Sequence, residues 1–254
     1  MTNWPSMSRV VGALMLLLVV GLVLGFIFGE TPDASREDIA GDLADVGDDE
    51  EIFAIGQAVT VVVALLVTVL GATLFSGLRL RNHWMASIGL VGFVGLGILF
   101  TASAATYATL NDLANDLAEG GAGGAGEAEV LEVARAISIV GDGLFFLGIW
   151  FFAIGLIGFG LVMATAPQVA AVGVSPGGVR AAIVSPPTWL GWIAVAAGVF
   201  YLLGVLIFIT EWFFILVALG FLLTIIWYLA GGIWYLFMAP ELVEEVEGKG
   251  ALAE

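Results

Sequence analysis

The sequence predicts an all-α fold, a polytopic transmembrane helix bundle of six spans with the N- and C-termini in the cytoplasm. Hydrophobic residues make up 61% of the chain, charged residues only 12%, and the mean hydropathy is +1.09. The apolar residues gather in long runs that short acidic segments separate. Because lipid offers the backbone no hydrogen-bond partners, runs of about 20 apolar residues indicate membrane-spanning helices rather than barrel strands.

Three spans are predicted in the first half of the chain, over residues 10–28, 52–78 and 84–110. The apolar run of the first span is longer than the roughly 7–15 residues usual for the core of a cleaved signal peptide. No Ala-x-Ala cleavage site follows it, because the chain continues Gly29-Glu30-Thr31-Pro32. We therefore expect the first span to remain in the protein as a membrane anchor.

The second half contains a span over residues 137–164 and a longer apolar run over residues 189–238. The longer run exceeds one helix, since about 20 residues cross a hydrocarbon core of about 30 Å. Its only charged residue is Glu211. A tight turn there divides the run into two predicted spans, residues 189–209 and 212–238.

The segments between spans differ in charge. Residues 30–51 contain ten acidic residues and residues 111–136 contain six, whereas residues 239–254 form an acidic tail. Ile39, Leu43 and Val46 have helical spacing and indicate a short surface helix in the first loop. The basic residues outside these two loops are Arg9, Arg79, Arg81, His83, Arg180 and Lys249. Six spans put all of them on one side, which the positive-inside rule makes cytoplasmic. The two acidic loops are then external, and the protein is expected in the cytoplasmic membrane.

The overall acidity has two interpretations. The net charge is −16, and one lysine accompanies six arginines. The acidic loops could bind cations or basic partners. Alternatively, they hydrate the surface of a protein from a salt-adapted prokaryote, which we favour. Nucleic acid is not an expected partner, because few basic residues are available to neutralise phosphates.

Several kinds of chemistry are excluded by composition. The chain has no cysteine and one histidine, and no lysine lies in any predicted span. Disulfides, thiolate metal sites, a bis-histidine haem within one chain and a retinal Schiff base are therefore absent. No nucleotide-binding signature occurs in a suitable context. We expect no catalytic residues, no cofactor and no metal site, and hence a protein that is not an enzyme.

Small residues mark candidate helix contacts. Gly21, Gly25 and Gly29 recur every four residues in the first span, a pattern that allows helices to approach closely. We assign this ladder to packing inside the bundle, with a homodimer interface as the alternative.

One carboxylate, Asp142, lies within a predicted span, about five residues from its start. Gln57, Tyr107 and Ser138 fall at similar depth or one helical turn away, so the four residues form a candidate polar intramembrane cluster. An ionisable residue in a span suggests a functional site. The alternative is that Asp142 is hydrated near the interface or bonds a neighbour such as Ser138.

The later half carries Asp142-Gly143 through Gly148, Gly155 and Gly160, followed by Trp189-Leu-Gly-Trp192 and Ala197 to Gly204. This pattern resembles six-helix prokaryotic membrane proteins known as domains of unknown function. The resemblance implies a six-helix bundle and no activity or site residues.

These observations favour a membrane protein with a structural or interaction role, whose partners are the lipid bilayer and either another membrane protein or further copies of itself. The alternative is a small-solute or ion permease with its pathway near Asp142. Discontinuous helices would favour the permease, but no span is interrupted by proline.

Overall fold

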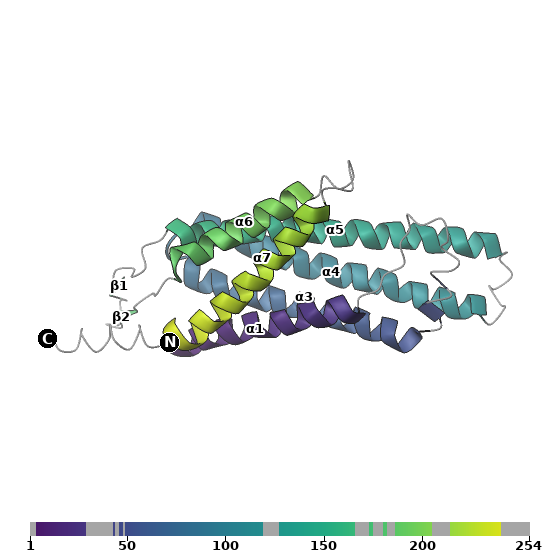
Figure 1. Cartoon of the computed structure of the whole chain (residues 1–254), viewed down its shortest axis with the longest axis horizontal. Coiled ribbons are helices and arrows are strands. Elements are labelled where there is room, and N and C mark those ends of the chain that lie inside the picture. The colour runs from purple at the N-terminus through teal and green to yellow at the C-terminus, as the bar shows by residue number, and fades with distance from the viewer. Residues whose placement is uncertain are drawn as a thin grey trace. The chain divides into compact units, whose positions relative to one another are not determined.

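The computed structural model is all-helical apart from one two-residue strand pair, and its described residues include six apolar helices, as expected for a membrane helix bundle (Figure 1). It describes residues 4–28, 43, 46–47, 49–118, 127–165, 173–174, 180–181, 186–204 and 214–239. The helices are α1 (Trp4–Phe28), α3 (Glu50–Leu78), α4 (His83–Ala118), α5 (Glu127–Thr165), α6 (Thr188–Gly204) and α7 (Phe214–Ile233), which continues as the π-helix η3 (Trp234–Met238). Five of them are long and apolar enough to cross a membrane, whereas α6 is shorter. The multi-pass helical class is therefore as predicted.

Two helices extend well beyond the predicted spans. Residues 111–136 were predicted to form a loop, but α4 continues to Ala118 and α5 begins at Glu127. With 36 and 39 residues, these helices are roughly 54 and 58 Å long at 1.5 Å per residue. A hydrocarbon core is only about 30 Å thick. Hydropathy predicts only where a helix leaves the lipid. The helix itself can continue into the charged segment, because its backbone hydrogen bonds do not depend on apolar side chains.

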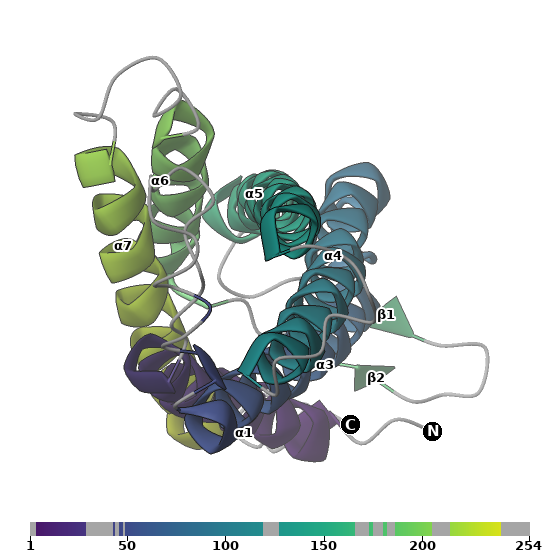
Figure 2. The same ribbon diagram turned by 90° about the vertical axis from the view of Figure 1, so that its right-hand side faces the viewer.

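The connections of the second half are only partly described. The strands β1 (Gly173–Val174) and β2 (Arg180–Ala181) form a two-residue antiparallel pair between α5 and α6. The predicted turn at Glu211 lies outside the described residues. Helices α6 and α7 nevertheless pack antiparallel, side by side in both views (Figures 1 and 2). A Cβ at Gly204 would meet Val217, and one at Gly220 would meet Tyr201.

The chain divides into two compact units, and each packs around its own core. Unit 1 comprises residues 1–19, 66–94 and 150–254. Its centre is aromatic: the Phe93 ring lies 5.2 Å from the rings of Phe152 and Phe159 and 6.4 Å from Trp227, measured between centroids. These rings are fully or almost fully buried. Aromatic pairs at such distances add favourable edge-to-face contacts to the packing.

Glycines bring the helices of unit 1 together. A Cβ at Gly92 would lie 2.4 Å from the Gly155 backbone, and one at Gly191 would lie 2.4 Å from the Ala164 backbone nitrogen. Similarly, a Cβ at Gly12 would lie 2.7 Å from the carbonyl oxygen of Gly232. Neighbouring backbones therefore touch where one residue has no side chain, as in small-residue packing of membrane helices.

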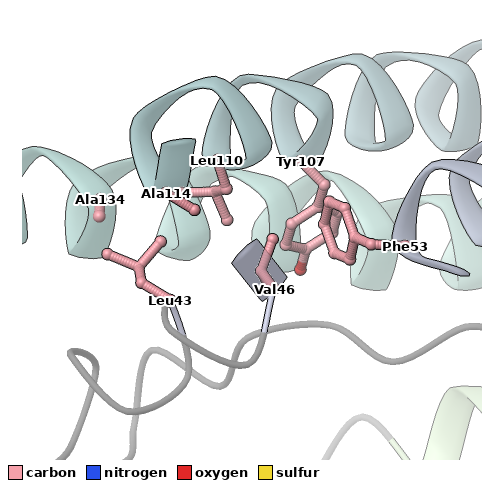
Figure 3. Close-up of a cluster of buried hydrophobic side chains, with 7 residues drawn as sticks. All are labelled: Leu43, Val46, Phe53, Tyr107, Leu110, Ala114 and Ala134. Carbon is pink, nitrogen blue, oxygen red and sulfur yellow. The ribbon is translucent and has the colours of Figure 1, made fainter. Parts of the chain in front are cut away.

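Unit 2 comprises residues 20–65 and 95–149 and has an apolar core of a different kind. Figure 3 shows this core, which we call the outer cluster and which consists of Leu43, Val46, Phe53, Tyr107, Leu110, Ala114 and Ala134. Leu43 and Val46 are helical and buried, in agreement with the short helix predicted there. The cluster accounts for the continuation of α4 past residue 110, because Ala114 on this extension is buried in it together with Leu110 at the end of the predicted span.

Candidate functional site

Asp142 of α5 and Tyr107 of α4 form the centre of the candidate polar cluster. The Tyr107 hydroxyl donates a hydrogen bond to Oδ1 of Asp142. Tyr107 is 3% exposed, whereas Asp142 is half-buried. A hydrogen bond to a charged acceptor is stronger than one between neutral groups. The sequence-based grouping of these two residues is therefore matched by direct contact between their side chains.

The helix backbones are drawn together at the same point. The Ser103 hydroxyl, one turn before Tyr107, donates a 2.9 Å hydrogen bond to the carbonyl oxygen of Gly141. A Cβ at Gly141 would lie only 2.8 Å from the Tyr107 ring, so glycine is what lets the ring reach across to the neighbouring carboxylate. Ser103 is a contributor that the predicted cluster did not include. Its position four residues before Tyr107 was the available signal, since such residues share a helix face.

The other two predicted members are placed less closely. Ser138 is fully buried on α5, one turn before Asp142, and it does have an interaction partner. Gln57 is buried on α3. Within the described part of the chain, no hydrogen bond joins Gln57 to Asp142. The structure therefore brings Asp142 and Tyr107 into contact. The membership of Gln57 in the cluster stays a prediction from sequence.

The outer cluster covers the Tyr107 side of this pair. Tyr107 belongs to both, because its ring packs with Val46 and Phe53 while its hydroxyl binds Asp142 (Figure 3). A second polar contact lies nearby: Asn111 Nδ2 donates a 3.2 Å hydrogen bond to Oε1 of Glu50. Val46, the start of α3 and the end of α4 are thus held together around Tyr107.

The depth of Asp142 follows from the length of α5. Residues 143–164 contain no charged side chain, and at 1.5 Å per residue they are long enough for a hydrocarbon core of about 30 Å. The helix can cross the bilayer with Asp142 at the border rather than inside. This arrangement favours a packing role for the Tyr107–Asp142 bond. Within the described ranges, no group of three His, Cys, Asp or Glu side chains could hold a metal ion.

The predicted glycine ladder of α1 is only partly correct. A Cβ at Gly21 would lie 2.6 Å from Val63, so this glycine is a contact point. Among the described residues a Cβ at Gly25 would meet nothing within 4 Å, so this glycine makes no close contact within the bundle, and the homodimer interface stays the alternative for it. Each four-residue step rotates a helical position by about 40°, so a straight helix does not keep such a ladder against one neighbour. Gly29 lies outside the described residues.

Helices α4 and α5 cross closely at Gly89 and Gly92 on α4 and at Gly155 and Gly158 on α5. Of these four glycines, the sequence predicted only Gly155 as a contact, because Gly141, Gly148 and Gly155 recur every seven residues and indicate a packing seam. A Cβ at any of these three would lie 2.7–2.8 Å from an aromatic side chain of α4, so they are contact points. The signal for Gly89, Gly92 and Gly158 was a Gly-x-x-Gly pair in each of two consecutive spans, which places small residues on one face of both helices.

Comparison with known proteins identifies the family. The family model described as Domain of unknown function (DUF4386) matches residues 10–239, which include all six apolar helices except the start of α1. The chain belongs to this family, and the resemblance predicted from its later half is confirmed. No curated protein matches the chain, and no solved structure matches it.

Proposed function

We propose that this member of the DUF4386 family is a non-enzymatic membrane protein that acts by binding another protein at its acidic end. The acidic end is defined here as residues 43, 46–47 and 49–53, the end of α4 from Tyr107, and the start of α5 up to Ile137. We further propose that the protein spans the cytoplasmic membrane of a salt-adapted prokaryote, with its acidic end on the external side and both termini in the cytoplasm. The observation that carries the proposal is the outer cluster.

The outer cluster supports a folded platform beyond the lipid. Helices α4 and α5 are each more than 20 Å longer than a hydrocarbon core, from their residue counts and a rise of 1.5 Å. Their extensions bury Leu110, Ala114 and Ala134 against Leu43 and Val46. Ordering this many residues costs conformational entropy. A segment that only connected two spans would not need to be ordered in this way.

Charge indicates what kind of partner would bind there. Exposed acidic side chains surround the cluster, namely Asp49, Glu50, Glu51, Asp112, Glu129 and Glu132. Arg135 is the exposed basic residue among them. Two copies meeting through this face would repel each other, since like charges placed together are unfavourable. The surface therefore suits a different protein with a basic face. The buried outer cluster beneath these acids is the reason to prefer a binding role at this end of the molecule to the hydrating role favoured from sequence for the acidity as a whole.

The permease alternative rests on Asp142. This carboxylate remains half-buried rather than enclosed, and a Cβ at the neighbouring Gly143 would meet nothing within 4 Å. An accessible acid at the membrane border could receive a cation or a proton. Against this, its bond to Tyr107 already gives Asp142 a role in holding α4 to α5.

Complementation of a deletion strain distinguishes the two functions. A quadruple Glu→Gln variant removes charge from the acidic end while keeping side-chain shape, and it changes Glu50, Glu51, Glu129 and Glu132. A matched control makes four Glu→Gln changes in the tail, at Glu241, Glu244, Glu245 and Glu247. We expect only the first variant to lose function, with normal amounts of inserted protein.

Asp142→Asn completes the test, because it keeps hydrogen bonding but removes the charge. Under the interaction proposal it should complement the deletion. Full activity of the quadruple variant together with an inactive Asp142→Asn protein would overturn the interaction proposal in favour of the permease.

A further inference from the structure

The turn between α3 and α4 concentrates positive charge in an acidic protein. Three of the five residues from Arg79 to His83 are basic, although the whole chain carries a net charge of −16. The turn lies between the apolar ends of two long helices, since α3 ends at Leu78 and α4 begins at His83. This position puts it at the level of lipid headgroups.

Two of the three basic side chains lie beside one aromatic ring. The Arg79 guanidinium carbon lies 5.9 Å from the centroid of the Phe75 ring, and the His83 ring lies 5.9 Å from the same centroid. A cation over an aromatic face is held by the ring quadrupole. Phe75 therefore keeps Arg79 and His83 near each other on the same turn.

The backbone of the turn is closed by hydrogen bonds. The Arg81 amide donates to the Leu78 carbonyl at 3.0 Å. Asn82 begins α4 as its cap, because its Oδ1 accepts a 3.1 Å hydrogen bond from the Met85 amide. The turn thus presents its side chains from a defined backbone rather than from a long loop.

Arg79 and His83 are exposed, and neither forms an ion pair with a carboxylate of the described residues. Two large apolar side chains stand beside them: Leu80 is 66% exposed and Trp84 is 79% exposed. The positive-inside rule accounts for the sign of the charge. It does not account for an aromatic support under the arginine or for an exposed tryptophan and leucine at the same turn.

We propose that this turn binds the phosphodiester of an anionic phospholipid. Arg79 and His83 donate hydrogen bonds to the phosphate oxygens, and Arg81 adds charge from its half-buried position. Arginine suits this task because its planar guanidinium can bind two phosphate oxygens at once. Leu80 and Trp84 contact the acyl chains and the glycerol region, where tryptophan is favoured. The proposal is independent of the function proposed for the acidic end.

Lipid titration of the purified full chain tests the proposal. Dioleoyl-phosphatidylglycerol is added to the protein in dodecyl maltoside, and its binding is followed by the rise in the melting temperature. Dioleoyl-phosphatidylcholine and inorganic phosphate serve as separate additions. We expect phosphatidylglycerol alone to stabilise the protein. Arg79→Gln should weaken its apparent affinity about fivefold, the equivalent of about 1 kcal/mol per basic residue near an anionic lipid surface.

Two further variants separate binding from folding. Arg79→Lys keeps the charge but not the planar guanidinium, so it should recover only part of the affinity that Arg79→Gln loses, whereas Arg135→Gln removes an exposed arginine from α5 and should retain the full lipid effect. An equal response to phosphatidylcholine, or an equal loss in Arg135→Gln, would overturn the proposed site. Stabilisation by inorganic phosphate of the same size would mean a free-anion site and would equally overturn the lipid assignment.

Discussion

The crossing of α4 and α5 at Gly92 makes the sharpest prediction about stability. A Cβ at this position would lie 2.4 Å from the Cα and nitrogen of Gly155 and from the Phe151 carbonyl oxygen. All three atoms belong to backbone, so no side-chain rotation can relieve the overlap. Gly92→Ala should therefore separate the two helices and destabilise the protein.

The size of the effect follows from the geometry. Ordinary contacts begin at 3.4 Å, so the new methyl group is about 1 Å too close. Overpacking of this kind costs about 1–3 kcal/mol. Moving the helices apart by this distance also loses part of the dispersion energy around the crossing. Alanine recovers roughly 1 kcal/mol through its higher helix propensity. We expect a net destabilisation of about 2 kcal/mol.

Gly143→Ala is the matched control, because it makes the same change in α5 where a Cβ would meet nothing within 4 Å. Melting in detergent, followed by size-exclusion fluorescence, should place Gly92→Ala about 4–8 °C below the parent protein, at roughly 2–4 °C per kcal/mol. Gly143→Ala should melt at or above the parent. Equal melting temperatures for the two variants would refute the close crossing of α4 and α5.

Three further predictions concern unit 2 and topology. Gly21→Leu should cost about 1–3 kcal/mol of stability because its side chain would overlap Val63, whereas Gly25→Leu should melt like the parent protein. A larger loss of stability in Gly25→Leu would show that Gly25 packs against another helix after all. Tyr107→Phe should lower stability by about 1.5–3 kcal/mol through loss of its bond to Asp142, and unchanged melting would show that this bond does not hold α4 to α5. Ser35→Cys, in a chain without cysteine, should react with an impermeant maleimide on intact cells; labelling only after lysis would reverse the predicted orientation.

Much of the candidate site could be expected from sequence, because Asp142 is the only acid in its span and Tyr107 lies at a similar depth. Their contact could not be derived, since it depends on how α4 and α5 are rotated about their axes. Ser103 and Gly141 show this dependence. The Ser103 hydroxyl donates a hydrogen bond to the Gly141 carbonyl oxygen because these faces of α4 and α5 meet there. The outer cluster was equally hidden, because Leu43 and Val46 are short apolar interruptions in an acidic segment.

The sequence by itself determined the membrane class and the number of apolar helices, because hydropathy over about 20 residues is a direct consequence of bilayer thickness. It also excluded thiol and Schiff-base chemistry, since the chain has no cysteine and its one lysine lies outside the predicted spans. Only the tertiary structure decided which glycines touch another helix. Gly25 and Gly92 are alike in sequence terms, yet one faces open space and the other a neighbouring backbone. The physical reason is that a crossing point is set by the rotation and angle of two helices together, which neither helix encodes alone.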